Sequence, residues 1–347
     1  MLLSPELASS ASLRVLHLGG YWRGENDMVR NMMLGLRAAG VEVFEYCTDD
    51  HLEALDTEGR DYARGTNGPV WLRYDHLGPI IEQLDPHLVI CNATGLAFRP
   101  ADAERIRRRR CLLGIALSDP DVFEPTTRHI AGTFDRYLTN APDCVGRYAA
   151  IGVAVGVLPL ATNTAFFRPV PPRPELACEV LVLGRAHPDR VEPVRALVER
   201  FDVHVYGEDW ERHGVTSRGF IFGNDSLAAL SSARMTVAFF RSPSGHAQVK
   251  VALFNFAATG VLVVTNRFPE VEPYFRYGEE IVGFDSTAEL LALVRHYLDH
   301  PAEAAAISAA GRARVLAEHT WPHVWPRVLA GLSQPLPSGA PWPMPVS

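Results

Sequence analysis

The sequence lacks the features of a secreted or metal-binding protein. Its 347 residues include five cysteines, an odd number with no CxxC pair. This pattern favours reduced thiols in a cytosolic protein over a disulfide framework or a zinc site. The N-terminal segment MLLSPELASSASLR has no basic stretch followed by a long apolar core, so it predicts no signal peptide. We therefore expect a cytoplasmic protein.

Surplus basic charge and long apolar runs are also missing. The formal net charge is -7, which argues against a general nucleic-acid binder. The one basic run, Arg107–Arg110, is explained by a solvated helix end. No apolar run approaches the ~20 residues that span a bilayer, so we expect no integral membrane segment.

Several catalytic signatures are absent. The loop after the first predicted strand reads G-G-x-x-x-G instead of G-x-G-x-x-G, which argues against a dinucleotide-binding dehydrogenase. The sequence contains no Walker A, HExxH or GxSxG motif.

Short apolar runs alternate with helical patterns along the whole chain. This rhythm predicts an α/β fold in which parallel sheets carry helices on both faces. Strands are expected at 13–18, 41–46, 87–91, 111–117, 137–139, 155–158, 179–183, 203–206, 235–239, about 261–266 and 280–283. Helices are expected at about 27–39, 101–109, 190–200, 225–233, 250–260, 287–298 and 302–319.

The segment RPVPPRP at 168–174 interrupts this rhythm. Its four prolines exclude a helix interior or a central strand, so it is the predicted linker between two doubly wound, Rossmann-like halves. A chain of this length can form two cores. The expected division is a first domain at 1–168, a linker at 169–175, a second domain at 176–330 and a proline-rich tail at 331–347.

Ligands of open parallel sheets bind beyond the carboxyl ends of the strands, against helix N-termini that favour anions. In the second half, Gly184 ends a predicted strand, and Arg185 and Arg190 flank the start of the next helix. Two guanidinium groups beside a helix N-terminus suit a diphosphate. The alternative is a pair of surface arginines that form ion pairs with Asp189 or Glu192.

A second candidate is the loop RSPSGHAQVK and the helix that follows it. His246 and Lys250 can turn donors towards a phosphate or a sugar, although a histidine in such a loop is more often structural. Asn255 lies further along the helix. It is either a buried amide satisfied by backbone groups or a ligand for a hydroxyl.

In the first half, the candidate general bases are Glu25, Asp27 and Asp119, because these carboxylates follow predicted strands. For each of them, capping a helix or ordering a loop is an equally good interpretation. His17 lies inside the first strand and is interpreted as a packed core histidine.

These segments, taken in order, resemble group 1 (family 4) GT-B glycosyltransferases, and in particular the CgeB-like branch. The similar segments are LLGIALSDPD, LPLATNTAFFRP, GRAHPDR, FNFAATGVLVVTN, YFRYGEEIVGFDSTAELLALVRHYLDHP and GRARVLAEHTW. The resemblance implies two Rossmann-like domains that face each other across a cleft. It also implies a UDP- or dTDP-type nucleotide-sugar donor in the second domain, a small-molecule or glycan acceptor in the first, a hexosyltransferase-type reaction, and no metal or cofactor.

The sequence departs from the family pattern at two positions. Where the family has the Glu that holds the ribose hydroxyls, this chain has Asn255, and Ala247 replaces the second Glu of retaining members. We therefore expect an altered pentose contact, such as the deoxyribose of a dTDP-sugar. The alternatives are an epimerase or hydrolase of nucleotide sugars with the same fold, and a non-catalytic binding protein.

Overall fold

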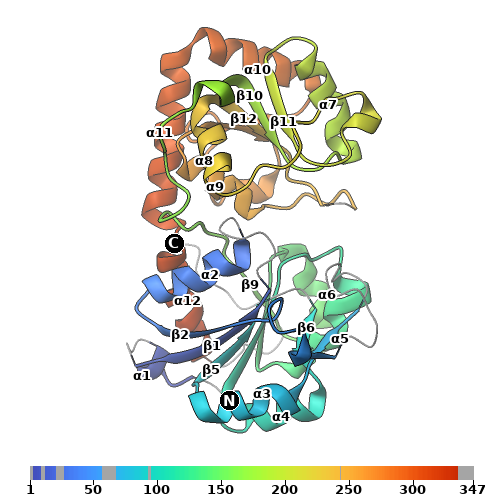
Figure 1. Cartoon of the computed structure of the whole chain (residues 1–347), viewed down its shortest axis with the longest axis vertical. Helices are drawn as coiled ribbons and strands as arrows, with labels where there is room; N and C mark the ends of the chain where they lie inside the picture. The colour runs from blue at the N-terminus through green and yellow to red at the C-terminus, as the bar shows by residue number, and fades with distance from the viewer. Residues whose placement is uncertain are drawn as a thin grey trace. The chain divides into compact units, whose positions relative to one another are not determined.

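The computed structural model describes residues 3–8, 12–20, 27–56, 68–92, 95–242 and 244–334. The chain forms two compact units, one comprising Met1–Pro159 with Trp321–Ser347 and the other Leu160–Thr320. Each unit has a parallel sheet covered by helices (Figure 1). The predicted α/β class, with two doubly wound units, is confirmed. None of the described helices is long and apolar enough to cross a membrane.

Unit 1 is built on a six-stranded sheet in the order β2-β1-β5-β7-β8-β9. Every strand pairs in parallel with its neighbour. The central strands are buried along their whole length because helices cover both faces, which explains their continuous apolar runs. The strands are β1 Arg14–Gly19, β2 Glu42–Cys47, β5 Leu88–Cys91, β7 Cys111–Ala116, β8 Arg136–Thr139 and β9 Gly156–Val157. The helices are α1 Pro5–Ala8, α2 Met28–Ala38, α3 Tyr74–Leu84, α4 Pro100–Arg107, α5 Arg128–Ile130, α6 Val145–Ala150 and α12 Trp321–Leu332.

Unit 1 also contains a small sheet and several helices that the sequence pattern did not predict. The strands β3 Leu55–Asp56, β4 Val70–Leu72 and β6 Leu96–Phe98 form a three-stranded sheet. Strands this short are below the length at which alternation is visible. One of the missed helices, α3, contains Gly78 and Pro79 in its middle, and these residues hide a helical pattern.

The last described helix, α12, belongs to unit 1, although residues up to 330 were expected in the second domain. It packs against α2, where the indole nitrogen of Trp325 donates to the carbonyl oxygen of Met32 at 2.8 Å. A Cβ atom at Gly35 would come within 2.0 Å of Trp321 Cβ, so only glycine permits this approach. The sequence did not reveal α12 because Pro326 lies inside it.

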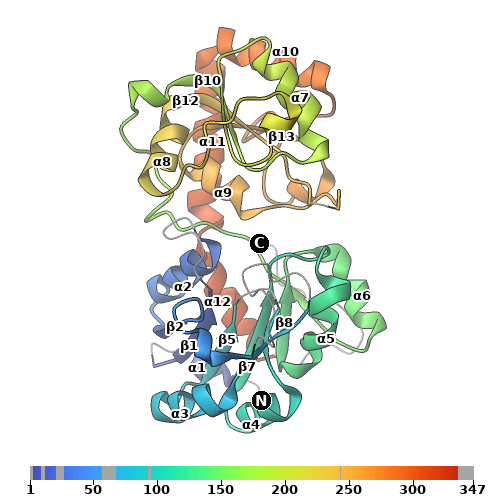
Figure 2. The ribbon, with the colours of Figure 1, turned by 45° about the vertical axis from the view of Figure 1, so that its right-hand side comes forward.

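Unit 2 contains a five-stranded parallel sheet in the order β11-β10-β12-β13-β14 (Figure 2). Successive side chains of β10 point to opposite faces of the sheet. Val180 and Val182 belong to the core cluster shared with α7 and α10, whereas Leu181 is buried outside that cluster. The strands are β10 Cys178–Leu183, β11 Val203–Tyr206, β12 Ala233–Ala238, β13 Leu262–Asn266 and β14 Val282–Phe284. The helices are α7 Pro188–Val198, α8 Gly223–Ser232, α9 Val251–Ala258, α10 Thr287–Asp299 and α11 Pro301–Glu318.

The proline-rich segment differs from the expected linker. It lies inside unit 2, whose first residue is Leu160. The backbone N–H groups of Val170 and Arg173 donate to the hydroxyls of Ser231 and Ser232 near the end of α8, at 3.1 and 2.8 Å. These two hydrogen bonds attach the segment to a neighbouring helix of unit 2.

Candidate functional site

The sheet of unit 2 changes direction between β10 and β12. The chain leaves β10 for β11 on one side and returns to β12 on the other, so the carboxyl ends of β10 and β12 flank a topological switch point, where ligands of such sheets bind. Arg190, in the first turn of α7, spans this point. Its Nη1 donates to the carbonyl oxygen of Arg185, and its Nη2 donates to that of Phe239, each at 3.2 Å.

Arg190 is buried, and burial lowers the pKa of its guanidinium while the Asp189 carboxylate opposes that shift. Its Nε lies 3.8 Å from Asp189 Oδ1, one of the two pairings considered from the sequence. The guanidinium therefore places a fixed positive charge beneath the switch point and also ties two strand-end loops together.

Gly184 allows the loops after β10 and β11 to lie against each other. Its φ is +123° and that of Gly207 is +138°, both in the region that favours glycine. A Cβ atom at Gly207 would come within 2.2 Å of Gly184 O. The same carbonyl oxygen accepts a hydrogen bond from the Trp210 indole at 2.8 Å. The structure thus places Gly184 at the close turn that the sequence predicted.

Arg185 lies on the surface of this loop, with about half of its side chain exposed. Its Nη2 contacts Glu208 Oε2 at 2.6 Å, and its Nε contacts Asp209 Oδ2 at 2.9 Å. These partners come from the loop after β11, whereas the sequence suggested Asp189 or Glu192. The Arg190 guanidinium binds the backbone carbonyl oxygen of Arg185. The Arg185 guanidinium itself binds the carboxylates of Glu208 and Asp209.

A histidine that the sequence analysis did not single out lies among these cations. His187, the residue before α7, has its pKa lowered, first by burial and then by the charges of Arg190 and Lys250. The Lys250 ammonium group donates to the carbonyl oxygen of Arg241 at 2.7 Å, in the loop after β12. The loops after β10 and β12 therefore both place positive charge near His187. The only sequence signal for His187 was its position between the two arginines of GRAHPDR.

Two further predicted residues have neighbours within unit 2. The backbone N–H of His246 donates to Ser242 Oγ at 3.2 Å, which places His246 in the turn before α9. The side-chain oxygen of Asn255 accepts from Thr162 Oγ1 at 2.6 Å. Asn255 is thus largely buried and satisfied by a side chain, where the sequence suggested backbone partners. One of the two lone pairs of its amide oxygen is therefore used, and the residue offers one acceptor position and its N–H donors to a ligand.

An exposed aromatic pair lies beside this region. The rings of Phe220 and Phe222 are stacked at 5.6 Å with an interplanar angle of 16°, and 59% and 45% of the two residues are exposed. The preceding residue, Gly219, accepts the N–H of Gly207 at 2.8 Å, so this loop adjoins the turn at Gly184. Exposed paired phenylalanines are unusual without a partner surface. The sequence analysis did not single out this pair.

In unit 1, Asp119 is completely buried after β7. Its Oδ1 accepts from the Thr127 hydroxyl at 2.8 Å, and its Oδ2 accepts from the hydroxyls of Thr139 and Tyr148, each at 2.7 Å. Burial raises the pKa of Asp119, and the three hydroxyl donors counteract this shift. The carboxylate orders the surrounding loops, which was the alternative to a catalytic base.

The other predicted bases have different positions. Asp27 is the N-cap of α2, and its side chain accepts from the N–H of Arg30 at 3.0 Å, which was again the alternative interpretation. Glu25 lies outside the described residues. His17 is fully buried; burial lowers its pKa to about 3, and its Nε2 accepts from Asn92 Nδ2 at 3.0 Å, as expected of a core histidine.

Two buried acceptor atoms flank the Gly19-Gly20 turn after β1. Asp49 Oδ2 and Asn92 Oδ1 accept no hydrogen bond from the part of the chain that the structure describes. A Cβ at Gly20 would come within 2.9 Å of the Asp49 carboxylate, and one at Gly19 within 3.1 Å of Asn92 O. This turn lies at the switch point between β1 and β5. Asp49 was missed because it follows a strand without any motif.

The described residues contain no group of three or more His, Cys, Asp and Glu side chains placed to hold a metal ion.

Comparison with known proteins supports the resemblance seen in the sequence. Residues 188–330 match a family described as "Glycosyl transferase-like". No curated protein matches this sequence. Over these residues the chain is similar to glycosyltransferases.

The fold is that of GT-B enzymes. Sucrose-phosphate synthase from Thermosynechococcus elongatus is 15% identical, with a TM-score of 0.58 over 92% of this chain and 96% of that chain. Anabaena HepE, solved with UDP and glucose, is 11% identical, with a TM-score of 0.58 over 92% and 99%. An α-glucosyltransferase, solved with UDP-glucose and DNA containing an abasic site, is 8% identical, with a TM-score of 0.68 over 93% and 100%. The GT-B fold class is confirmed, and the family match supports a group 1 glycosyltransferase.

Proposed function

We propose that this protein transfers a sugar, of the hexose type, from a nucleotide-diphosphate sugar to a hydroxyl or amine of a small-molecule or glycan acceptor. We further propose that it does so as a cytoplasmic member of the CgeB-like branch. The observation that carries the proposal is the bridge made by Arg190 across the switch point of unit 2, with Arg185, His187 and Lys250 around it.

In such a reaction the bond between the anomeric carbon and the diphosphate breaks, and the nucleoside diphosphate leaves with the electron pair. Arg190 and Lys250 supply positive charge where negative charge develops on the leaving group, and the first N–H groups of α7 add to it. Arg185 contributes its charge when its guanidinium turns from Glu208 and Asp209 to the diphosphate. A bound diphosphate also favours the protonated form of His187. Protein cations can thus do the work that a metal ion does elsewhere, so we propose a metal-independent transfer without cofactor.

The nucleoside is proposed to lie along the same edge of unit 2. An exposed phenylalanine ring offers a stacking surface to a nucleobase. We propose that Phe220 or Phe222 stacks on the base of the donor nucleotide. Asn255 cannot accept from two ribose hydroxyls, because Thr162 occupies one of the two lone pairs of its single acceptor oxygen. We therefore retain the proposal that the pentose contact tolerates a deoxyribose, and that the donor is dTDP- or UDP-linked.

The acceptor is proposed to bind in unit 1 at the Gly19-Gly20 turn. An unsatisfied buried acceptor costs about 1–3 kcal/mol, and an acceptor hydroxyl or amine that donates to Asp49 Oδ2 or Asn92 Oδ1 relieves this cost. If the anomeric configuration inverts, Asp49 and Glu25 are the carboxylates that we propose as the base.

The direct test measures nucleoside diphosphate release from a panel of UDP- and dTDP-hexoses, with and without a mixed panel of sugar and amine acceptors, in the presence of EDTA. A transferase releases the diphosphate only when an acceptor is present. Turnover of the donor alone would instead identify an epimerase or hydrolase. Donor binding without release under any condition would identify a non-catalytic binding protein. Loss of activity in EDTA would contradict metal independence alone.

A further inference from the structure

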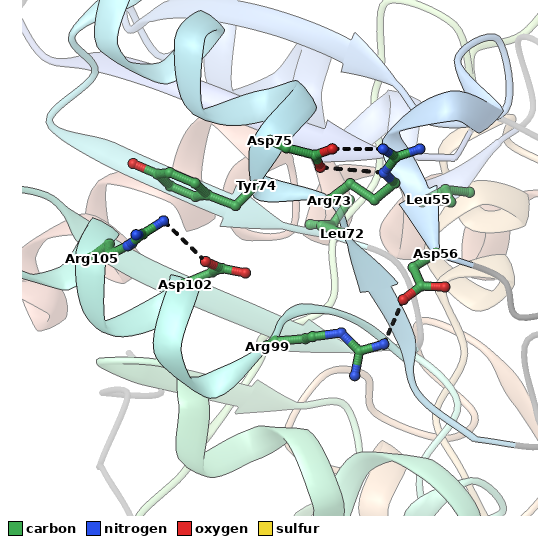
Figure 3. A pocket seen from close by; sticks show the side chains of 9 residues that line it. All are labelled: Leu55, Asp56, Leu72, Arg73, Tyr74, Asp75, Arg99, Asp102 and Arg105. Carbon is green, nitrogen blue, oxygen red and sulfur yellow. Dashed lines mark hydrogen bonds and ion pairs between the residues drawn. The ribbon is translucent and has the colours of Figure 1, made fainter.

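Unit 1 has a hollow away from the strand ends described above. It lies between the small sheet β3-β4-β6 and the first residues of α3 and α4, and its volume is about 590 Å³ (Figure 3). That volume is within the roughly 300–1,000 Å³ of small-molecule sites. No residue of this hollow belongs to the proposed donor or acceptor positions.

Charged groups of both signs surround the hollow in equal number. Three arginines and three aspartates line it, so their formal charges cancel. As Figure 3 shows, each arginine is paired with a carboxylate across or beside the opening. The pairs are Arg73–Asp75 at 2.6 Å, Arg99–Asp56, and Arg105–Asp102 at 3.6 Å. A charged ligand would have to displace one partner of such a pair, so this arrangement disfavours simple anions and cations.

Aromatic rings hold two of the guanidinium groups in place. Arg105 lies over the ring of Tyr74 at 5.3 Å, and Arg99 lies over the ring of Trp71 at 5.5 Å. A guanidinium stacked in this way keeps its N–H donors directed outward from its edge. Tyr74 itself lines the hollow (Figure 3), so a ring face and planar donor groups meet at one opening.

The lining retains hydrogen-bonding capacity. Arg73 uses Nε and Nη2 to bind Asp75, and among the described residues its Nη1 has no acceptor. Among the described residues, the polar contact of the Arg105 guanidinium is the long ion pair with Asp102, beside its contact with the Tyr74 ring. Carboxylates accept several hydrogen bonds each. Leu55 and Leu72 add apolar surface between these polar groups.

We propose that this hollow binds a neutral carbohydrate chain. Sugar hydroxyls donate and accept at once, so they can bridge the free N–H groups of Arg73 or Arg105 and the oxygens of Asp102 without a change in net charge. The C–H face of a pyranose ring packs on an aromatic ring such as that of Tyr74. The binding is independent of the transfer reaction and of the nucleotide.

The test is calorimetric titration of the full chain, without nucleotide, with malto-, cello- and chito-hexaose, and with a galacturonic acid hexamer as the anionic comparison. We expect at least one neutral hexasaccharide to bind. Arg105→Ala and Asp102→Asn should each weaken that binding about tenfold, or about 1.4 kcal/mol. Both side chains are partly exposed on α4, so the fold should tolerate the changes.

Arg108→Ala is the matched control, because Arg108 is the C-cap of the same helix, pairs with Glu104 and does not line the hollow. It should bind as the unmodified protein does. Binding of none of the neutral hexamers, preference for the galacturonic acid hexamer, or equal binding by Arg105→Ala and Arg108→Ala would each overturn the proposal. UDP affinity, measured in the same samples, reports separately on the donor site.

Discussion

The guanidinium of Arg190 donates to the carbonyl oxygen of Phe239 at 3.2 Å, and so joins the first turn of α7 to the end of β12. The same group also binds the carbonyl oxygen of Arg185 after β10. One buried cation thus fixes both walls of the switch point, and its structural role cannot be separated from its charge. Arg185 and Arg190 are therefore expected to respond differently to substitution.

Arg185→Ala should lower kcat/KM by an amount equivalent to about 2–4 kcal/mol, the range for removal of one group that stabilises developing charge. Its side chain is half exposed, so the free energy of unfolding should change little. Steady-state kinetics and urea unfolding measure the two effects. Arg212→Ala is the control, because Arg212 also pairs with Asp209 and is exposed. Unchanged kinetics in Arg185→Ala would remove this residue from the mechanism.

Arg190→Ala should lose both nucleotide binding and stability. The substitution leaves the carbonyl oxygens of Arg185 and Phe239 without their donor, at a cost of roughly 2–4 kcal/mol in the free energy of unfolding. Urea unfolding of this variant is compared with that of Arg200→Ala, which changes an exposed arginine beyond the end of α7. A variant as stable as the unmodified protein would contradict the bridging role.

Asp119→Asn should impair stability more than activity. Asn has one acceptor oxygen for the three hydroxyls that Asp119 now binds, and each lost hydrogen bond to a charged group costs about 1.5–3 kcal/mol. Activity at a temperature well below the unfolding transition should stay within a few fold. A fall of 10²–10⁴-fold, typical of a lost general base, would restore Asp119 as a catalytic residue.

His17 should make unit 1 sensitive to acid. Its pKa is about 3 in the folded protein, below its ordinary value of 6.5, because the imidazole is buried beside the charge of Arg37. As the pH falls, the unfolded chain binds a proton at His17 before the folded chain does. The contribution of the neutral His17 to the free energy of unfolding is therefore fully present above pH 6.5 and is lost as the pH falls towards 3. Within this window, His17 lowers the free energy of unfolding by up to about 1.4 kcal/mol for each pH unit of acidification.

His17→Gln retains an acceptor for Asn92 and removes this titration. Its free energy of unfolding, measured in urea between pH 6 and pH 4, should fall less steeply than that of the unmodified protein. His300→Gln, which changes an exposed histidine of unit 2, serves as the control. Identical slopes in all three proteins would show that His17 does not limit acid stability.

Asn255→Glu should change the preference between nucleotides. A carboxylate at this position can accept from Thr162 with one oxygen and from the ribose 2′-hydroxyl with the other. We expect the affinity for UDP to rise relative to that for dTDP, by calorimetry. If the unmodified protein already binds UDP clearly more tightly, the deoxyribose hypothesis is wrong.

Much of the fold could be predicted from the chain itself. The runs at β1, β5, β7, β10 and β13 are apolar because helices cover both faces of a parallel sheet, and such runs are visible without a structure. The position of Gly184 followed from the need for a turn directly after a strand. The helices α3 and α12 were missed because Pro79 and Pro326 interrupt their pattern, and only packing against their units stabilises them.

The sequence alone determined which residue types follow the strands. It therefore predicted that cations gather at the strand ends of unit 2 and carboxylates at those of unit 1. Tertiary structure decided what those groups contact. Asp119 is enclosed by three hydroxyls, and His187 is placed among the cations. Asp49 has one oxygen that accepts no hydrogen bond from the described residues. Local pattern specifies where a strand ends, but side-chain partners come from segments far along the chain, and only folding brings those segments together.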